Sequence, residues 1–129
     1  MTRIVVANRG EIAVRILRAV DDLGFEGVSV YADDDTAALH VMRADHSVAL
    51  PGTGPAAYLD ADAIIAAARA AGADAIHPGY GFLSENADFA RAVADADLTF
   101  IGPPPSVLRA LGNKATARTL AEAAGVPVP

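Results

Sequence analysis

The chain has 129 residues, which fits one domain large enough to bury a core without staples. It has no cysteine, which excludes disulfides, thiolate metal sites and cysteine nucleophiles, and its net charge of −6 with scattered basic residues argues against a nucleic-acid or membrane surface. The first apolar run turns polar at Asn8, too early for a signal peptide or a membrane span, so we expect a soluble, cytoplasmic protein with small-molecule partners.

Strands and helices alternate in the first half of the predicted structure. A helical pattern runs from Glu11 to Gly24, and a second runs from Asp60, a residue that suits a helix start, to Gly72. The apolar stripe of the first helix consists of Ile12, Ile16, Val20 and Leu23. Continuous apolar runs favour buried parallel strands, and these runs are residues 3–7, 28–32 and 47–50.

The same alternation continues in the second half. The sequence predicts strands at 75–76 and 99–101, helices at 87–96 and 114–124, and a short helical turn at 106–111. Ser84 and Asn86 are candidate caps for the helix at 87–96, and Asn113 is the candidate cap for the last one. Strands alternating with helices indicate an α/β fold, a doubly wound parallel sheet of about five strands with helices on both faces.

The stretch from Ala73 to Asn86 does not continue the repeating core pattern. Pro78 ends a strand, Gly79 and Gly81 flank Tyr80, and a helix follows. In a doubly wound sheet, ligands bind at the carboxyl ends of the strands where the winding direction reverses. With the assumed strand order 3-2-1-4-5, residues 8–10 and 77–86 meet at that edge.

Other readings of the same residues compete with a ligand site. The glycines can serve only a tight turn. A dinucleotide-binding domain would place Asp33 on a ribose hydroxyl but requires G-x-G-x-x-G, and the first turn offers only Gly10. A receiver-type signalling domain lacks its acidic residues after the first strand, and a non-catalytic scaffold domain fits tolerably.

Several polar residues receive no chemical role from the pattern. The histidines have no metal-ligand spacing, and the acidic run from Asp33 to Asp35 is interpreted as a solvated turn. One face of the first helix carries charges at three- and four-residue spacing, by default a solvated surface. These charges are Glu11, Arg15, Arg18 and Asp22.

Three motifs together resemble the N-terminal region of biotin carboxylases. They are Ala7-Asn-Arg-Gly-Glu-Ile-Ala13, His77-Pro-Gly-Tyr-Gly-Phe-Leu-Ser-Glu-Asn86 and Leu111-Gly-Asn-Lys114. They occur in the family's order and spacing, and the similarity runs over essentially the whole chain. The resemblance implies a Rossmann-like pre-ATP-grasp domain over residues 1–112, with residues 113–129 beginning a truncated ATP-grasp region.

The resemblance also implies an activity for the longer enzyme. MgATP (or MnATP) activates bicarbonate to carboxyphosphate, and biotin on a carrier domain is carboxylated at N1′. The family's base and metal ligands lie outside this stretch, so we expect no catalytic and no metal-binding residue here and an inactive fragment. The implied partners are the remainder of the biotin carboxylase, the biotin carboxyl carrier domain, a carboxyltransferase subunit of an acyl-CoA carboxylase and a second subunit in a homodimer.

Individual roles follow from the positions that match the family motifs. The resemblance implies that Tyr80 and Gly81 line the biotin pocket and that Lys114, the only lysine, contacts ATP. It places Arg15, Arg18 and Asp22 at the homodimer interface. Asn113 departs from the family's usual aspartate. The runner-up is the N-terminal lobe of another ATP-grasp ligase of the carbamoyl-phosphate synthetase kind, and Tyr80 favours the biotin branch.

Overall fold

A computed structural model describes residues 1–112 and 114–125. The strands are β1 (Arg3–Val6), β2 (Glu26–Tyr31), β3 (His46–Ala49), β4 (Ala75–His77) and β5 (Thr99–Phe100). The helices are α1 (Gly10–Asp22), α2 (Leu39–Met42), α3 (Ala61–Ala70), α4 (Ala87–Asp95), α5 (Pro105–Leu111) and α6 (Lys114–Ala123). Two short 3₁₀ helices, η1 (Asp33–Asp35) and η2 (Pro55–Leu59), lie in the connections.

The five strands form one parallel sheet in the order β3-β2-β1-β4-β5, which confirms the assumed order. The central strand β1 pairs Val5 with Val28 of β2 on one side and with Ile76 of β4 on the other. The carboxyl ends of β1 and β4 are therefore neighbours, and the loops that follow them leave the same edge of the sheet.

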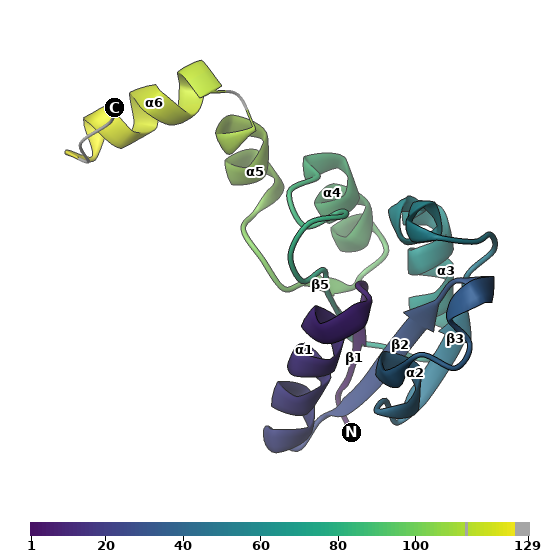
Figure 1. Cartoon of the computed structure of the whole chain (residues 1–129). Helices are drawn as coiled ribbons and strands as arrows, with labels where there is room; N and C mark the ends of the chain where they lie inside the picture. The colour runs from purple at the N-terminus through teal and green to yellow at the C-terminus, as the bar shows by residue number, and fades with distance from the viewer. Residues whose placement is uncertain (113, 126–129) are drawn as a thin grey trace.

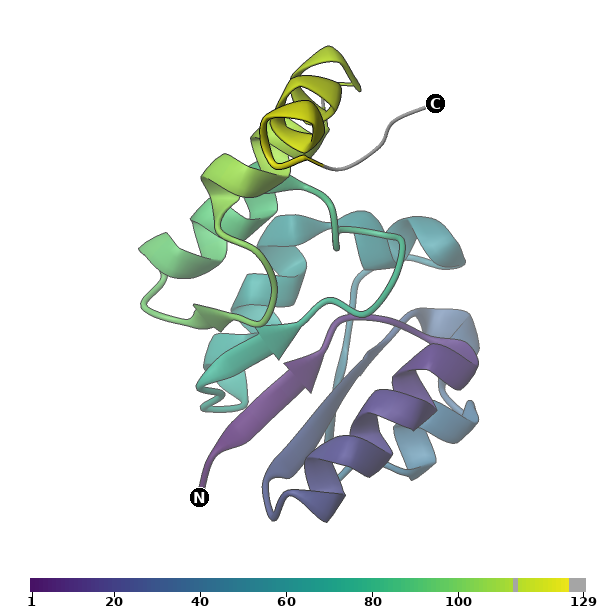
Figure 2. The ribbon, with the colours of Figure 1, turned by 90° about the vertical axis from the view of Figure 1, so that its left-hand side faces the viewer.

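Helices cover the two faces of the sheet unequally (Figures 1 and 2). Strand side chains alternate, so Val5 and Ile76 pack with Ile64 of α3 and Phe89 of α4 on one face. The other face packs against α1 and includes Val6 of β1, which contacts Ala13 and Leu17 of α1. The last helix, α6, lies beyond α5 and away from the sheet (Figure 1).

Helix boundaries follow local capping chemistry. The side chain of Asn86 accepts a hydrogen bond from the backbone N–H of Phe89, so of the two cap candidates for α4 it is Asn86 that caps the helix. The side chain of Asp60 accepts the N–H of Ala63, so Asp60, predicted as the first residue of its helix, caps α3 instead. Helix α6 begins at Lys114. Asn113 lies outside the described residues, so the cap predicted there stays a prediction.

Two sequence interpretations need correction. The predicted turn at Asp33–Asp35 is the 3₁₀ helix η1, and residues 36–45, for which no element was predicted, contain the four-residue helix α2, which is too short to show a helical period. In α1 the side chains buried against the sheet are Ala13, Leu17 and Val20, whereas Leu23 is 70% exposed. The predicted apolar stripe therefore lies beside the buried face and coincides with it only at Val20.

Within residues 1–112 and 114–125, no helix is long and apolar enough to cross a membrane.

Candidate functional site

The loops after β1 and β4 are joined by one buried side chain. Asn8 is 1% exposed, and its amide nitrogen donates to the carbonyl oxygens of Pro78 at 2.9 Å and Tyr80 at 2.7 Å. Its side-chain oxygen accepts the backbone N–H of Arg9 at 2.9 Å. The first loop thus holds the second at two points, as the position of both loops at the switch point predicts.

The second loop has a backbone that few sequences adopt. Gly79 and Gly81 have φ angles of 70° and 68°, in the left-handed region that glycine tolerates, and Phe82 follows at φ 47°. A Cβ atom on Gly79 would also lie 2.6 Å from the amide nitrogen of Asn8. Gly79 is therefore required both for its backbone angle and for the close approach of Asn8.

His77 supports the same loop from the end of β4. Its Nδ1 atom accepts the backbone N–H of Gly79 at 3.1 Å, so the neutral ring carries its proton on Nε2. Burial lowers the pKa of His77, which favours this neutral form. The histidine acts as a backbone acceptor here, in keeping with its position before a proline.

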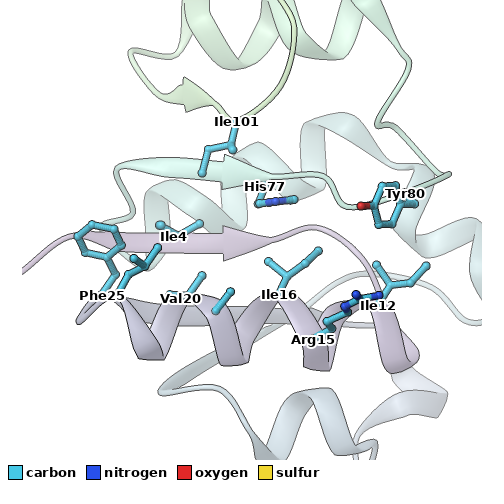
Figure 3. Close-up of a pocket in the computed structure, with 11 residues that line it drawn as sticks. Ile4, Ile12, Arg15, Ile16, Val20, Phe25, His77, Tyr80 and Ile101 are labelled. Atoms are coloured by element: carbon cyan, nitrogen blue, oxygen red, sulfur yellow. The ribbon is translucent and has the colours of Figure 1, made fainter.

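Tyr80 presents its side chain away from this fixed backbone. The residue is 72% exposed and lies at one end of an apolar groove of about 540 Å³ (Figure 3). Arg15 and Ile12 of α1 lie at the same end, and Phe25 lies at the other. The remaining lining residues come from β1, α1, β4 and the end of β5, and include Ile4, Ile16, Val20, Leu23, His77 and Ile101.

A second polar cluster begins at Arg9, the residue after Asn8. The guanidinium of Arg9 contacts both carboxylate oxygens of Asp35 at 3.0 and 3.1 Å and lies 5.6 Å from the ring centre of Tyr58. The Tyr58 hydroxyl donates to Asp35 at 2.7 Å and accepts from the N–H of Ala32. Asp35 is therefore a structural anchor, and the interpretation of residues 33–35 as a solvated turn is wrong for this residue.

This cluster shifts the proton affinities of its members. The Tyr58 hydroxyl, and then Arg9, lower the pKa of Asp35, while burial followed by the bond to Asp35 raises the pKa of Tyr58 to about 12. The bond to Asp35 raises the pKa of Arg9. The three groups therefore hold one protonation state around neutral pH.

The predicted subunit-contact residues all lie exposed on α1, but they flank different hollows. Arg15 borders the groove beside Tyr80, whereas Arg18 borders a smaller hollow with Asp21 and Arg43. Asp22 ends α1. An exposed charged face is compatible with a subunit interface, and that assignment stays a prediction.

The predicted nucleotide residue stands at the start of α6, which begins at Lys114. Its side chain lies outside what the structure describes, so its contact with ATP also stays a prediction. Among the described residues, no group of three His, Asp or Glu side chains is arranged to hold a metal ion.

The sequence interpretation missed the residues that shape the loop. Asn8 and Arg9 were assigned to a turn at the edge where the two loops meet, but neither side chain was given a role, and Tyr58 was not considered. The one usable signal was the position of Asn8 directly after the central strand, at the edge where the loops meet. Nothing in the spacing of Arg9, Asp35 and Tyr58 predicts their contact.

Comparison with known proteins gives a consistent result. Residues 1–108 match the family model described as biotin carboxylase, N-terminal domain. The chain is 54% identical to the biotin-dependent acyl-coenzyme A carboxylase alpha3 subunit of Mycobacterium leprae, covering 99% of this chain and 22% of that protein. It is 51% identical to the biotin carboxylase of Halalkalibacterium halodurans, covering 98% of this chain and 28% of that protein.

A solved structure shows the same fold. The biotin carboxylase domain of a single-chain bacterial carboxylase superimposes with a TM-score of 0.95 at 58% identity, over 99% of this chain and 30% of that one. The chain thus spans less than a third of each of these relatives. Because the family model covers most of the chain and the superposition covers nearly all of it, this chain belongs to the family of biotin carboxylase N-terminal domains.

Proposed function

We propose that this domain is the N-terminal part of a biotin carboxylase and forms one wall of its biotin site. In the proposed reaction, bicarbonate takes the γ-phosphoryl group of ATP to give carboxyphosphate and ADP. The carboxyl group then passes to N1′ of carrier-bound biotin, and phosphate is released. The observation that carries the proposal is Tyr80, an exposed aromatic side chain on a backbone fixed by Asn8 and His77.

Tyr80 and Gly81 suit a flat polar heterocycle such as the biotin ring system. The tyrosine offers an apolar ring face and a hydroxyl that can donate or accept. Gly81 has nothing within 4 Å of the position of a Cβ, so a ligand can approach its backbone closely. The domain would therefore bind and orient biotin, while the base and the Mg²⁺ ligands come from the remainder of the enzyme.

We assign the nucleotide contact to Lys114, the first residue of α6. The first N–H groups of a helix attract anions, and an ammonium group there can act on the same phosphate. In a complete enzyme, Lys114→Gln should raise the Michaelis constant for ATP about tenfold or more while that for biotin changes little. Arg109→Gln, an exposed change on α5, is the matched control.

The apolar groove beside Tyr80 suits contact with another part of the proposed carboxylase. It exposes apolar side chains of α1 on the face of the sheet that α3 and α4 do not cover. The relatives extend well beyond the matched segment, so we assign the groove to the remainder of the carboxylase. The charged face of α1 would serve a homodimer, and the carrier domain and carboxyltransferase would complete a cytoplasmic acyl-CoA carboxylase.

A chimera provides the test. This chain would replace the matching 128-residue segment of the Halalkalibacterium halodurans biotin carboxylase. We expect the chimera to hydrolyse ATP in a bicarbonate-dependent manner and to carboxylate free biotin, and we expect the chain alone to give no turnover above a blank without enzyme. A folded chimera that hydrolyses ATP but ignores biotin would refute the role of this domain at the biotin site.

A further inference from the structure

We propose that Asn8 is a positioning residue whose side-chain amide fixes Tyr80 and Gly81 in the geometry that binds biotin. The inference rests on the proposed function and adds a residue to it. Asn8 itself lies beneath the loop, 1% exposed, and touches the backbone of the loop, so it acts through Tyr80 and makes no contact with the substrate.

The hydrogen-bonding capacity of Asn8 matches this role. A primary amide has two donor hydrogens, and here one serves the carbonyl of Pro78 and the other the carbonyl of Tyr80. The amide oxygen accepts the N–H of Arg9, which fixes which end of the amide faces the loop. Aspartate at this position would have the same shape but would direct an acceptor at two carbonyl oxygens.

The loop needs this external support because its own sequence does not enforce its shape. Gly79 and Gly81 are both in the left-handed region, and a glycine backbone has more alternative conformations than any other residue. Phe82 also has a positive φ, which costs energy for a residue with a Cβ. The bonds from Asn8 span 70 and 72 residues of chain, so the loop takes this shape only when β1 and β4 are paired.

The exposure of Tyr80 explains why the arrangement serves binding. A side chain that is 72% exposed gains little from burial within this domain, yet the carbonyl of the same residue is held at 2.7 Å by a buried amide. Ordering a flexible loop on binding costs affinity, and a loop that is already ordered avoids that cost. The fixed backbone under an exposed ring is what a preorganised binding residue requires.

A measurement on the unmodified chain tests the contact first. In a hydrogen-exchange NMR experiment, both side-chain amide hydrogens of Asn8 should exchange about tenfold or more slowly than those of Asn86, whose exposed side chain uses its oxygen as a helix cap. Equal exchange rates for the two asparagines would overturn the proposal whatever the enzyme does.

Variants in the chimera then separate positioning from stability. Asn8→Ala and Asn8→Asp should raise the Michaelis constant for biotin about tenfold or more, the aspartate variant more strongly, while the constant for ATP changes less than about twofold. Ser29→Ala is the matched control, since it also removes a buried side-chain bond to a carbonyl, that of His40, away from the loop. The control should lower the melting temperature without changing the biotin constant.

The outcomes distinguish the two levels of inference. Asn8→Ala should loosen the loop, seen as faster exchange of the Gly79 N–H. If it does so and neither Asn8→Ala nor Tyr80→Ala changes the Michaelis constant for biotin, the amide contact is confirmed, but the positioning role and the assignment of biotin to this loop are both refuted. If Asn8→Ala leaves the biotin constant unchanged while Tyr80→Ala raises it, the loop binds biotin without Asn8, and the positioning role alone is refuted.

Discussion

Arg9 and Asp35 face each other in a two-point ion pair, with Nη2 to Oδ1 at 3.0 Å and Nε to Oδ2 at 3.1 Å. The pair joins the first loop of the sheet to η1, 26 residues further along the chain. The Tyr58 hydroxyl bonds to the same carboxylate, so three segments converge on Asp35. Geometry of this kind makes an ion pair stronger than a single exposed contact.

Replacing Asp35 should therefore destabilise the fold. Asp35→Ala leaves Arg9 and the Tyr58 hydroxyl without their shared acceptor, and we expect the free energy of unfolding to fall by about 1–3 kcal/mol. Urea unfolding followed by circular dichroism measures the change. Asp33→Ala, at an exposed position in the same acidic run, should change it by no more than about 0.5 kcal/mol. Equal effects at the two positions would show that the cluster adds nothing.

Acid should weaken the fold through His40. The ring is buried, its Nε2 faces the carbonyl of Val30 at 3.1 Å, and its Nδ1 has no hydrogen-bond partner. Burial lowers the pKa of His40 in the folded state, more strongly than the bond to Val30 and the charge of Asp35 raise it. As pH falls below about 6.5, the unfolded chain takes up a proton that the folded chain resists, so stability decreases.

The histidine responsible can be identified by substitution. His40→Gln keeps a donor for Val30 but does not titrate, so stability should fall less steeply between about pH 7 and pH 5 than in the original chain. Burial also lowers the pKa of His77, so His77→Gln should reduce the slope as well, and the double variant should reduce it most. Denaturant unfolding at several pH values measures the slope, and an identical slope in all variants would contradict the assignment.

Tyr80 should affect binding and leave stability almost unchanged. Because the side chain is largely exposed, Tyr80→Ala should leave the melting temperature nearly unaltered while raising the Michaelis constant of the chimera for biotin about tenfold, the scale of one lost aromatic contact. Tyr80→Phe separates the ring from the hydroxyl. Leu39→Ala, on an exposed apolar residue of α2, is the control for surface change. If Tyr80→Ala raised the Michaelis constant for ATP and left that for biotin unchanged, Tyr80 would belong to the nucleotide site instead.

Charge reversal on α1 tests the proposed subunit contact. Arg18→Glu should weaken the dimer of the chimera, seen by sedimentation, while the melting temperature of the isolated chain changes little because Arg18 is exposed. Arg91→Glu, on the exposed surface of α4, should leave the dimer intact. If Arg18→Glu unfolded the isolated chain, the charged face of α1 would stabilise the fold, and the proposed subunit contact would be refuted.

Local signals predicted the secondary structure because each operates within a few residues. Such signals include the helix start at Asp60, the cap at Asn86 and the apolar run of Ile4 to Val6. Together they lead to a parallel sheet with its switch point between β1 and β4. The order of the strands then places the two loops together without any knowledge of side chains.

Contacts through space could not be predicted in the same way. Asp33, Asp34 and Asp35 look alike in sequence, and only the path of the chain turns Asp35 toward Arg9 and Tyr58. In the sequence Asn8 likewise resembles an ordinary turn residue, and only the folded structure shows its contact with the loop after β4. Tyr80 and Gly81 were predicted as site residues from the resemblance of the motif. The resemblance indicates that these residues lie at a site, but it does not say which contacts hold them there.

The central position of β1 has a consequence for how the domain is made. During synthesis β1 emerges first, and β2 and β3 can join it once the first 50 or so residues are available, while its other edge must wait for β4 at residues 75–77. Until then Val5 and Val6 border an open strand edge, which is the kind of surface that recruits other chains. The pairing that closes this edge also brings Asn8 under Tyr80, so β1 gains its second neighbour and the loop gains its geometry in the same step, before β5 completes the sheet.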